Sequence, residues 1–229
     1  MTRVAACLAL VAAGLLTVSA CSSGQPAPAA SKVSVSSAQP TGSPSTASPA
    51  PSPSLSTSPA GAALRVHISS AFIEEFDTPL PADPAQAKVI AGFRNAMVAW
   101  DQASVTLRVT GRQAQYVTGS ALATLRKTVR AAAQDNLVQV GTDRLYDTKI
   151  TSITGTKATV TTCDDGSAWN QADRTTGQTQ APVPVTQQYI FVTFYMVPLD
   201  GHWAYTDLTV TTYPDQRAKT CMQDARTGV

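Results

Sequence analysis

The 229-residue sequence is poor in charged, aromatic and histidine side chains. Charged residues make up 14% of the chain, aromatic residues 6%, and there are two histidines. From residue 61 onward there are 15 Lys and Arg (17 in the whole chain less Arg3 and Lys32) against 15 Asp and Glu, so this part is formally neutral. A nucleic-acid groove normally carries a basic surplus, so we expect no nucleic-acid partner.

The composition excludes a collagen-like chain and a multi-pass membrane protein. One long apolar run is present, at residues 4–20, and it follows a single positive charge at Arg3 and ends in small residues. This is the pattern of a signal peptide. The run lies at the low edge of the length of a membrane span, and no basic cluster follows it, which argues against a permanent anchor.

The end of this run resembles the lipobox of bacterial lipoproteins, because Val18, Ser19 and Ala20 directly precede Cys21. In that family the peptidase cuts before a cysteine whose thiol carries a diacylglyceryl group. The sequence therefore predicts a lipoprotein signal peptide at 1–20 and lipidation of Cys21 with palmitate-type chains. The protein would then be held on the extracytoplasmic face of the cell membrane, since two or three acyl chains anchor durably. The alternative is an ordinary secretory leader that contains a cysteine near its cleavage site.

Residues 22–60 contain eight prolines, thirteen serines and one charged side chain, Lys32. Such a composition cannot bury enough apolar surface to offset the cost of ordering the chain. We therefore expect a disordered Pro/Ser/Ala-rich tether at 21–60, with a reach of about 35 Å as a flexible coil. Ser and Thr beside Pro also suit O-glycosylation, although plain linkers have the same composition.

Residues 61–229 are long enough for one hydrophobic core, and helix patterns precede strand patterns. Asp83, Pro84 and Gln86 form a helix start, with an Asp cap, Pro at the first helical position and Gln three residues after the cap. This helix should end near Ser104. A second helix should begin at 118–120. Four apolar residues spaced four apart also suggest a short helix, namely Leu64, Ile68, Phe72 and Phe76.

Strand patterns occupy 137–140, 144–153, 157–163, 186–197 and 202–213. The segment 186–197 is apolar on both sides, so both of its faces must be covered. Helices would cover one face, and a flanking segment or a partner would cover the other, which leaves room for a homodimer through the sheet. The expected fold is α+β, with N-terminal helices packed on a curved antiparallel sheet of about four to six strands.

Once Cys7 is removed with the leader and Cys21 is acylated, Cys163 and Cys221 are the remaining thiols. An even pair in an oxidising compartment predicts a disulfide. A catalytic cysteine is the competing interpretation, but neither thiol lies in a nucleophile motif. Zinc is a third interpretation, although the two cysteines, His67 and His202 lack the close pair spacing of structural zinc sites. We expect no metal and no cofactor.

The order of four motifs resembles the NTF2-like superfamily, and within it a group of lipoproteins of undefined function from high-GC Gram-positive bacteria. The motifs are the lipobox at Cys21, YVTGSAL at 116–122, ATVTTCDD at 158–165 and DGHW at 200–203. Cys221 matches the second cysteine of that group. The resemblance implies the cone-shaped α+β fold shared with ketosteroid isomerase and the SnoaL-like cyclases. This fold hosts enzymes, binding modules and scaffold parts, so it implies little about activity.

Enzymes of that superfamily rely on an acid or base in an apolar cavity, where desolvation raises the pKa of a carboxyl group. The candidates here are Asp207, which alternation places on one strand face with Trp203 and Tyr205, and Asp165. The competing interpretation is an exposed strand residue for Asp207, and a turn after the strand for Asp164 and Asp165. No catalytic triad, phosphate loop or metal motif is present in the sequence.

The leading hypothesis is therefore a lipid-anchored domain that does no chemistry and binds an envelope protein partner or a small apolar molecule. The scarcity of catalytic groups and the long tether support it. The alternative is an isomerase-, cyclase- or hydratase-like enzyme that uses Asp207 or Asp165 as a base, with Tyr205 beside it.

Overall fold

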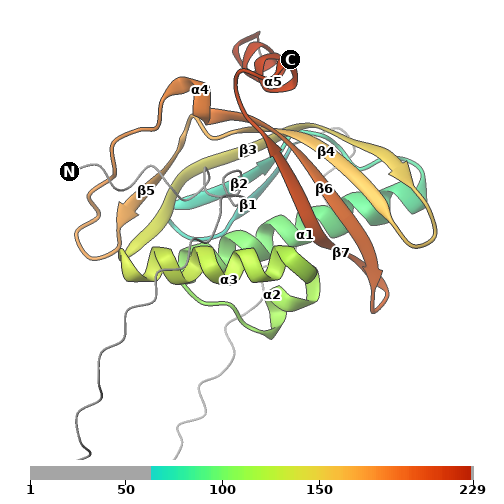
Figure 1. Cartoon of the computed structure of the whole chain (residues 1–229), viewed down its shortest axis with the longest axis horizontal. Helices are drawn as coiled ribbons and strands as arrows, with labels where there is room; N and C mark the ends of the chain where they lie inside the picture. The colour runs from blue at the N-terminus through green and yellow to red at the C-terminus, as the bar shows by residue number, and fades with distance from the viewer. Residues whose placement is uncertain (1–62, 228–229) are drawn as a thin grey trace, which may run out of the picture.

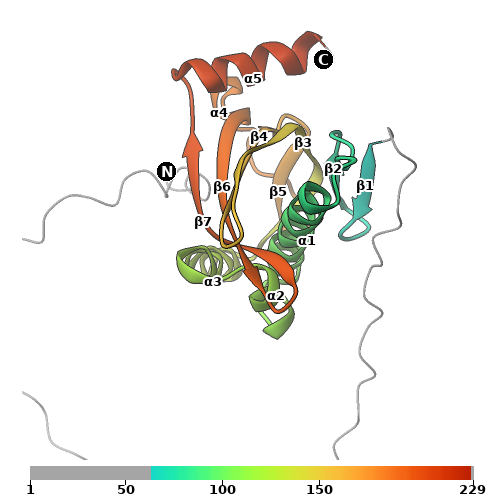
Figure 2. The same ribbon diagram turned by 90° about the vertical axis from the view of Figure 1, so that its right-hand side faces the viewer.

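The computed structural model describes residues 63–227, which form a mixed seven-stranded curved sheet with helices. The predicted signal peptide, the tether and Cys21 lie outside the described residues. Three helices, α1, α2 and α3, lie on one side of the sheet, and a C-terminal helix, α5, lies on the opposite side (Figures 1 and 2). Within the described part of the chain, no helix is long and apolar enough to cross a membrane.

Twelve elements follow one another along the chain. They are β1 (Leu64–His67), β2 (Phe72–Phe76), α1 (Pro84–Thr106), α2 (Gly111–Tyr116), α3 (Gly119–Gln134), β3 (Leu137–Ile153), β4 (Ala158–Asp165), β5 (Trp169–Asp173), α4 (Val185–Gln188), β6 (Tyr189–Leu199), β7 (His202–Thr211) and α5 (Gln216–Thr227).

The first segment differs from the sequence-based expectation, because residues 64–76 form a β-hairpin instead of a helix. Leu64 pairs with Phe76 across the hairpin, and Val66 pairs with Glu74. Side chains four residues apart share a face in a strand as well as in a helix, so the apolar spacing fits both structures. Strands therefore precede the helices, and the expected order of helices first is wrong in this respect.

The start of α1 follows the sequence-based expectation. The Asp83 side chain accepts a hydrogen bond of 2.8 Å from the backbone N–H of Gln86, and Pro84 occupies the first turn. This cap satisfies one of the N–H groups that a helix start leaves without partners. The helix ends at Thr106, close to the expected end near Ser104. The second expected helix is also present, as α3.

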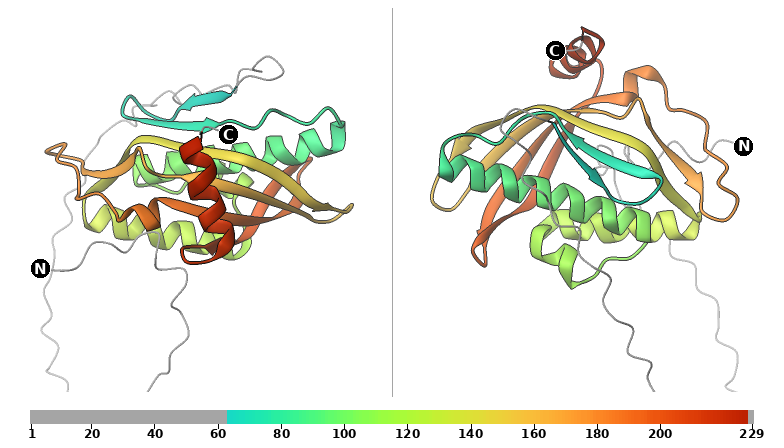
Figure 3. Two further views of the ribbon diagram at one scale, coloured as in Figure 1. Left: turned by 90° about the horizontal axis from the view of Figure 1, so that it is seen from above. Right: turned by 180° about the vertical axis from the view of Figure 1, so that it is seen from behind.

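The strand order across the sheet is β1-β2-β3-β4-β6-β7, and β5 also pairs with β3. All pairs are antiparallel except β2 and β3, which run parallel. The sheet is therefore mixed and has seven strands, where an antiparallel sheet of four to six was expected. The parallel pair arises because the chain passes through all three helices between β2 and β3, and Figure 3 shows α1 running along this part of the sheet.

Aromatic side chains fill the core between the sheet and α1. Phe93 of α1 lies edge-on to Phe76 at 6.3 Å and to Phe194 at 4.9 Å between ring centroids. Tyr205 of β7 packs edge-on against Phe194 at 5.6 Å and beside Trp100 at 5.9 Å. Such offset and edge-on contacts stabilise aromatic pairs beyond the burial of their area.

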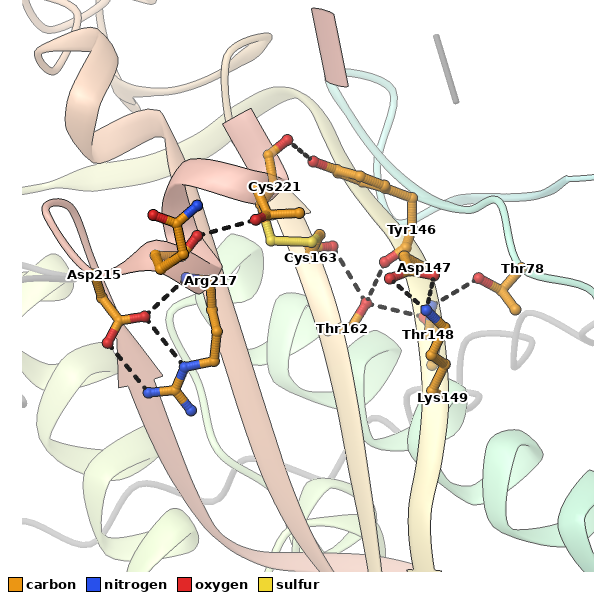
Figure 4. Close-up of a disulfide and its surroundings, with 12 residues drawn as sticks. Thr78, Tyr146, Asp147, Thr148, Lys149, Thr162, Cys163, Asp215, Arg217 and Cys221 are labelled. Atoms are coloured by element: carbon orange, nitrogen blue, oxygen red, sulfur yellow. Dashed lines mark hydrogen bonds and ion pairs between the residues drawn. A yellow bond between two sulfur atoms is a disulfide. The ribbon is translucent and has the colours of Figure 1, made fainter. Parts of the chain in front are cut away.

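The C-terminal helix α5 is held on the far side of the sheet by a disulfide between Cys163 of β4 and Cys221, which confirms the predicted pair (Figure 4). The Tyr146 hydroxyl of β3 donates a hydrogen bond to the backbone carbonyl of Cys221. Arg217 of α5 lies over the Phe191 ring of β6, with its guanidinium carbon 5.2 Å from the ring centre. Helix α5 is thus the flanking segment that covers one end of the two-sided apolar strand β6.

Candidate functional site

Buried polar atoms without a hydrogen-bond partner gather in the interior of the domain. Within residues 63–227 there are six such side-chain atoms: Glu74 Oε1 and Oε2, Asp101 Oδ2, Gln139 Oε1, Asp143 Oδ1 and Trp169 Nε1. Folded proteins pair nearly all their buried polar groups, so a concentration of exceptions marks a candidate site. We call the carboxyl groups of Glu74, Asp101, Asp143 and Asp164 the inner carboxyl cluster.

Strand alternation turns three of these acids toward the helices. Glu74 lies on the same face of β2 as the core residues Phe72 and Phe76, and its side chain is 0% exposed. Glu74 pairs with Asp143 across the parallel strands β2 and β3, and paired residues share a face. Asp164 of β4 pairs with the buried residue Leu145, which lies two residues after Asp143 on β3. The three acids therefore occupy the inner face of neighbouring strands.

The fourth acid comes from the helix that covers this face. Asp101 lies on α1 one residue after Trp100 and is 2% exposed. Its charge raises the pKa of the Glu74 carboxyl group and the pKa of the Tyr205 hydroxyl. Sheet and helix thus bring carboxyl groups together around the aromatic core.

Burial is the largest influence on the ionisation of the first pair. It raises the pKa of Asp101 to about 8 and holds the pKa of Glu74 well above its ordinary range. The nearby charge of Asp101 adds to the effect of burial on the pKa of Glu74. Two ionised carboxylates would repel each other at this depth, so the pair keeps its protons to a higher pH than free carboxyl groups do.

Asp143 and Asp164 form a second pair of the same kind. Burial raises the pKa of Asp143 to about 6, and burial followed by the nearby charge of Asp143 raises the pKa of Asp164 well above its usual value. Two carboxyl pairs, each able to hold one proton, therefore lie in one interior.

No positive charge compensates the cluster within the described residues, where none of the four acids forms an ion pair. The guanidinium groups nearest in sequence are engaged elsewhere: Arg94 donates to the backbone carbonyl of Thr78, and Arg144 pairs with Asp77. Between residues 63 and 227, no three His, Cys, Asp or Glu side chains are arranged to hold a metal ion. The arrangement can donate and accept protons and can receive a group that carries hydrogen-bond donors.

Exposure increases from one end of the cluster to the other. Glu74 and Asp101 are buried, whereas Asp143, Asp164 and Trp169 are partly exposed. Trp169 pairs with Gly141 on β3, two residues before Asp143, so its unpartnered indole N–H belongs to the same end of the sheet. The partly exposed acids therefore lie at the end of the cluster nearer to the surface.

The sequence-predicted residues divide between the interior and the surface. Tyr205 lies in the core, 1% exposed, and burial followed by the charge of Asp101 raises its pKa. Asp165 pairs with Arg144 at the end of β4, and its Oδ1 accepts from the backbone N–H of Ser167, as the turn interpretation expected. His202 lies at the start of β7, 2.8 Å from the backbone carbonyl of Gln115.

Asp207 is not brought into the interior, because a β-bulge interrupts the alternation of β7. Met196 pairs with Tyr205, but the preceding residue Tyr195 pairs with Asp207, so Thr206 is an extra residue in β7. The bulge turns Tyr205 inward and Asp207 outward, where its side chain is exposed and its Oδ1 accepts from the N–H of Leu208. Simple alternation, which placed Asp207 beside Tyr205, fails at this point.

Sequence reasoning missed Glu74, Asp101 and Asp143, although each lies in an apolar pattern. Glu74 alternates with Phe72 and Phe76, and Asp143 alternates with Leu145. Asp101 falls eight residues after Phe93, on the inward stripe of α1. An acid at an inward position of an apolar repeat is the pattern that would have found them.

Comparisons with known proteins show resemblance in shape alone. No family model and no curated protein matches the sequence. The solved structures that resemble it include a protein provisionally named scytalone dehydratase from Novosphingobium aromaticivorans (12% identity, 54% of this chain and 83% of that one, TM-score 0.38). A ketosteroid isomerase-like protein from Erwinia carotovora shares 11% identity over 56% of this chain and 96% of its own, with a TM-score of 0.34.

A protein of unknown function with a cystatin-like fold from Nostoc punctiforme gives the same picture, with 11% identity over 55% of this chain and 92% of its own, and a TM-score of 0.34. Likeness at this level carries neither an activity nor a ligand over to this chain.

Proposed function

We propose that this protein is a lipid-anchored extracytoplasmic lipoprotein whose domain binds a small organic amine at the inner carboxyl cluster, without chemistry. The observation that carries the proposal is the pair of buried carboxyl groups of Glu74 and Asp101, whose oxygens lack donors in the described structure. The acids favour a ligand with a cationic donor group over the purely apolar ligand that the sequence suggested.

An amine fits because buried carboxylates are costly unless a positive charge and hydrogen-bond donors accompany them. An ammonium group offers three donors and one charge, and charge-assisted hydrogen bonds to carboxylates are the strong ones. Aromatic side chains such as Trp100 and Tyr205 line the same interior and suit the carbon skeleton of such a molecule. The protons held by the two carboxyl pairs would leave when an ammonium group takes their place.

Calorimetric titration of the detergent-solubilised full chain with a series of alkyl monoamines and diamines tests this function. Binding should release protons, so the measured enthalpy should depend on the ionisation enthalpy of the buffer. The double variant Glu74→Gln/Asp101→Asn should lose binding, while Asp207→Asn, on the outer face, should retain it. Equal affinity of an uncharged isostere, such as the matching alcohol, would count against the cationic ligand.

A second candidate function is a proton-transfer enzyme of the isomerase or hydratase class. The observation that favours it is the Asp101 carboxyl group beside Tyr205, because a base with a pKa of about 8 can exchange a proton near neutral pH. In this function Asp101 would accept a proton from the substrate and the Tyr205 hydroxyl would donate one. Turnover of a ligand found in the amine screen, abolished in Asp101→Asn, would favour the enzyme over the binding protein.

Lipid anchoring through Cys21 is the part of the proposal that rests on sequence alone. Membrane fractions should contain the protein, and mass spectrometry of its first peptide should show a diacylglyceryl group with an acylated amine on Cys21. The Cys21→Ser variant should appear in the soluble extracytoplasmic fraction. A mature protein that begins at a residue other than Cys21 and carries no lipid would disprove the anchor. It would leave the proposal of an amine site untouched.

A further inference from the structure

A concave surface lies on the face of the sheet that points away from α1, α2 and α3. It is an open groove of about 450 Å³ across the strands β4, β6 and β7. We call it the outer groove. It is lined by Lys157, Ala158, Thr159, Tyr195, Met196, Val197, Thr206, Asp207 and Thr209.

The β-bulge in β7 builds this groove. Because Thr206 is an extra residue, Asp207 is turned outward and lies opposite Tyr195. Tyr195 in turn lies opposite Thr159 on its other side, so the three form one row across the face. Helix α3 fixes the bulge from within, since the Ser120 hydroxyl donates a 3.0 Å hydrogen bond to the backbone carbonyl of Thr206. Bulges commonly redirect side chains next to binding sites.

The row offers an exposed aromatic ring and an outward carboxylate, whereas the Thr159 hydroxyl already accepts a 3.1 Å hydrogen bond from the Ser152 hydroxyl. Tyr195 is 42% exposed, although large aromatic side chains usually lie inside. Asp207 uses Oδ1 for the N–H of Leu208, and Oδ2 has no recorded partner among the described residues. Lys157 contributes the one basic group of the lining and Asp207 the one acidic group. The groove is therefore formally neutral and carries hydroxyl, carboxylate and ammonium groups around one aromatic ring.

We propose that the outer groove binds an oligosaccharide of β-linked N-acetylhexosamine units. A pyranose ring in its chair form can lay a face of C–H groups on an aromatic ring, as Tyr195 offers, and its hydroxyl groups can accept from the hydroxyl groups of Thr159 and Thr209. The acetamido group supplies an N–H that can donate to Asp207 and a carbonyl that can accept from Lys157. A neutral lining suits an uncharged ligand, whereas a polyanion or polycation would find no complementary charge.

Among residues 63–227, the helix that covers this face of the sheet lies at its other end. Helix α5 packs there, over Phe191 and Cys163, and its residues do not line the outer groove. A second copy of the chain docked on this face is the competing occupant. It would need to bury on the order of 800 Å² per partner around the groove to be stable. This site is separate from the inner carboxyl cluster, so it stands or falls independently of the amine ligand.

The test is a titration of the detergent-solubilised full chain with the β-1,4-linked tetramer of N-acetylglucosamine, followed by NMR or calorimetry. The control ligand is the tetramer of β-1,4-linked glucose, which lacks the acetamido groups. It should bind about tenfold more weakly than the N-acetylglucosamine tetramer. Tyr195→Ala should weaken binding of the N-acetylated tetramer at least about tenfold, and Asp207→Asn should remove the preference for it over the glucose tetramer.

Tyr213→Ala is the matched control. Tyr213 is 46% exposed, lies near α5 with the Lys219 ammonium 5.5 Å from its ring centre, and does not line the groove. This variant should bind the tetramer like the unaltered protein. The proposal is overturned if the N-acetylated tetramer does not bind, if Tyr213→Ala lowers affinity as much as Tyr195→Ala, or if the chain is a dimer that Tyr195→Ala dissociates.

Discussion

Glu74 of β2 and Asp101 of α1 place two buried carboxyl groups within each other's electrostatic influence in the interior, and neither forms an ion pair within the described structure. The hairpin that precedes the helices and the helix that follows it therefore meet through two acids. This contact depends on pH, because two ionised carboxylates would repel each other.

Stability should fall as pH rises above the ordinary range of carboxyl groups. The pKa of Asp101 is raised from 3.8 to about 8 in the folded protein, so the folded state holds a proton that the unfolded chain has lost. Protons bound to the folded state stabilise it, and this contribution is complete below pH 3.8 and is lost progressively up to about pH 8. Within that window each such proton contributes a slope of about 1.4 kcal/mol per pH unit.

Urea unfolding at pH values between 5 and 8.5 measures this slope. Asp101→Asn should flatten it, because an amide does not ionise, and should raise stability most at the alkaline end. Asp207→Asn, an exposed acid on the outer face, should leave the slope unchanged. A free energy of unfolding that rises with pH across this range would contradict the protonated pairs.

Removal of the disulfide should destabilise the domain and release α5. Cys163 and Cys221 are 58 residues apart, and a loop of this length corresponds to about 4 kcal/mol in the chain-entropy description. The double variant Cys163→Ala/Cys221→Ala should show a loss of this order in chemical denaturation, together with faster amide exchange in α5. Tyr146→Phe, which removes only the hydroxyl bonded to the Cys221 carbonyl, should cost less. Unchanged exchange in α5 after the double substitution would show that packing alone holds it.

The sequence was informative where local chemistry decides the structure. The Asp83 cap, the strands of the second half and the pairing of Cys163 with Cys221 are all present as expected. Each depends on residues close in sequence or on the count of thiols. The parallel pairing of β2 with β3 joins segments separated by three helices, and no local pattern encodes it.

The candidate site was less predictable, because it depends on two irregularities that alternation alone does not reveal. The four-residue spacing of the apolar series from Leu64 to Phe76 fits a helix as well as a strand, and it hid the strand that turns Glu74 inward. The bulge at Thr206 separates Tyr205 from Asp207, which simple alternation places on one face. Tyr205 lies in the interior, whereas Asp207 lines the outer groove.

The N-cap of α1 offers a direct measure of local stabilisation. Asp83→Ala removes the acceptor of the Gln86 N–H, and the loss of such a cap costs about 1 kcal/mol. Asp83→Ser, which retains a side-chain oxygen, should recover most of this loss. Thermal unfolding of both variants measures the difference. Equal melting temperatures for Asp83→Ala and the unaltered protein would show that water satisfies this helix start equally well.

The close approach of α1 to the sheet at Gly92 should be intolerant of even one methyl group. Gly92 faces Trp203 of β7, and a Cβ at position 92 would lie 2.5 Å from both Trp203 Cβ and the Trp203 carbonyl oxygen. Helix propensity alone would favour alanine over glycine by about 1 kcal/mol. Contact with a backbone carbonyl cannot be relieved by rotating a side chain, so α1 would have to shift.

Gly92→Ala should therefore destabilise the protein by about 1–3 kcal/mol despite the gain in propensity. Gly111→Ala is the matched control, because a Cβ there, at the start of α2, would meet nothing within 4 Å. This control should leave the free energy of unfolding unchanged or slightly higher. Because α1 also carries Asp101, a shift of the helix at Gly92 should change the pH dependence of unfolding, which Gly111→Ala should preserve. A Gly92→Ala variant as stable as the unaltered protein would mean that α1 does not pack this closely on β7.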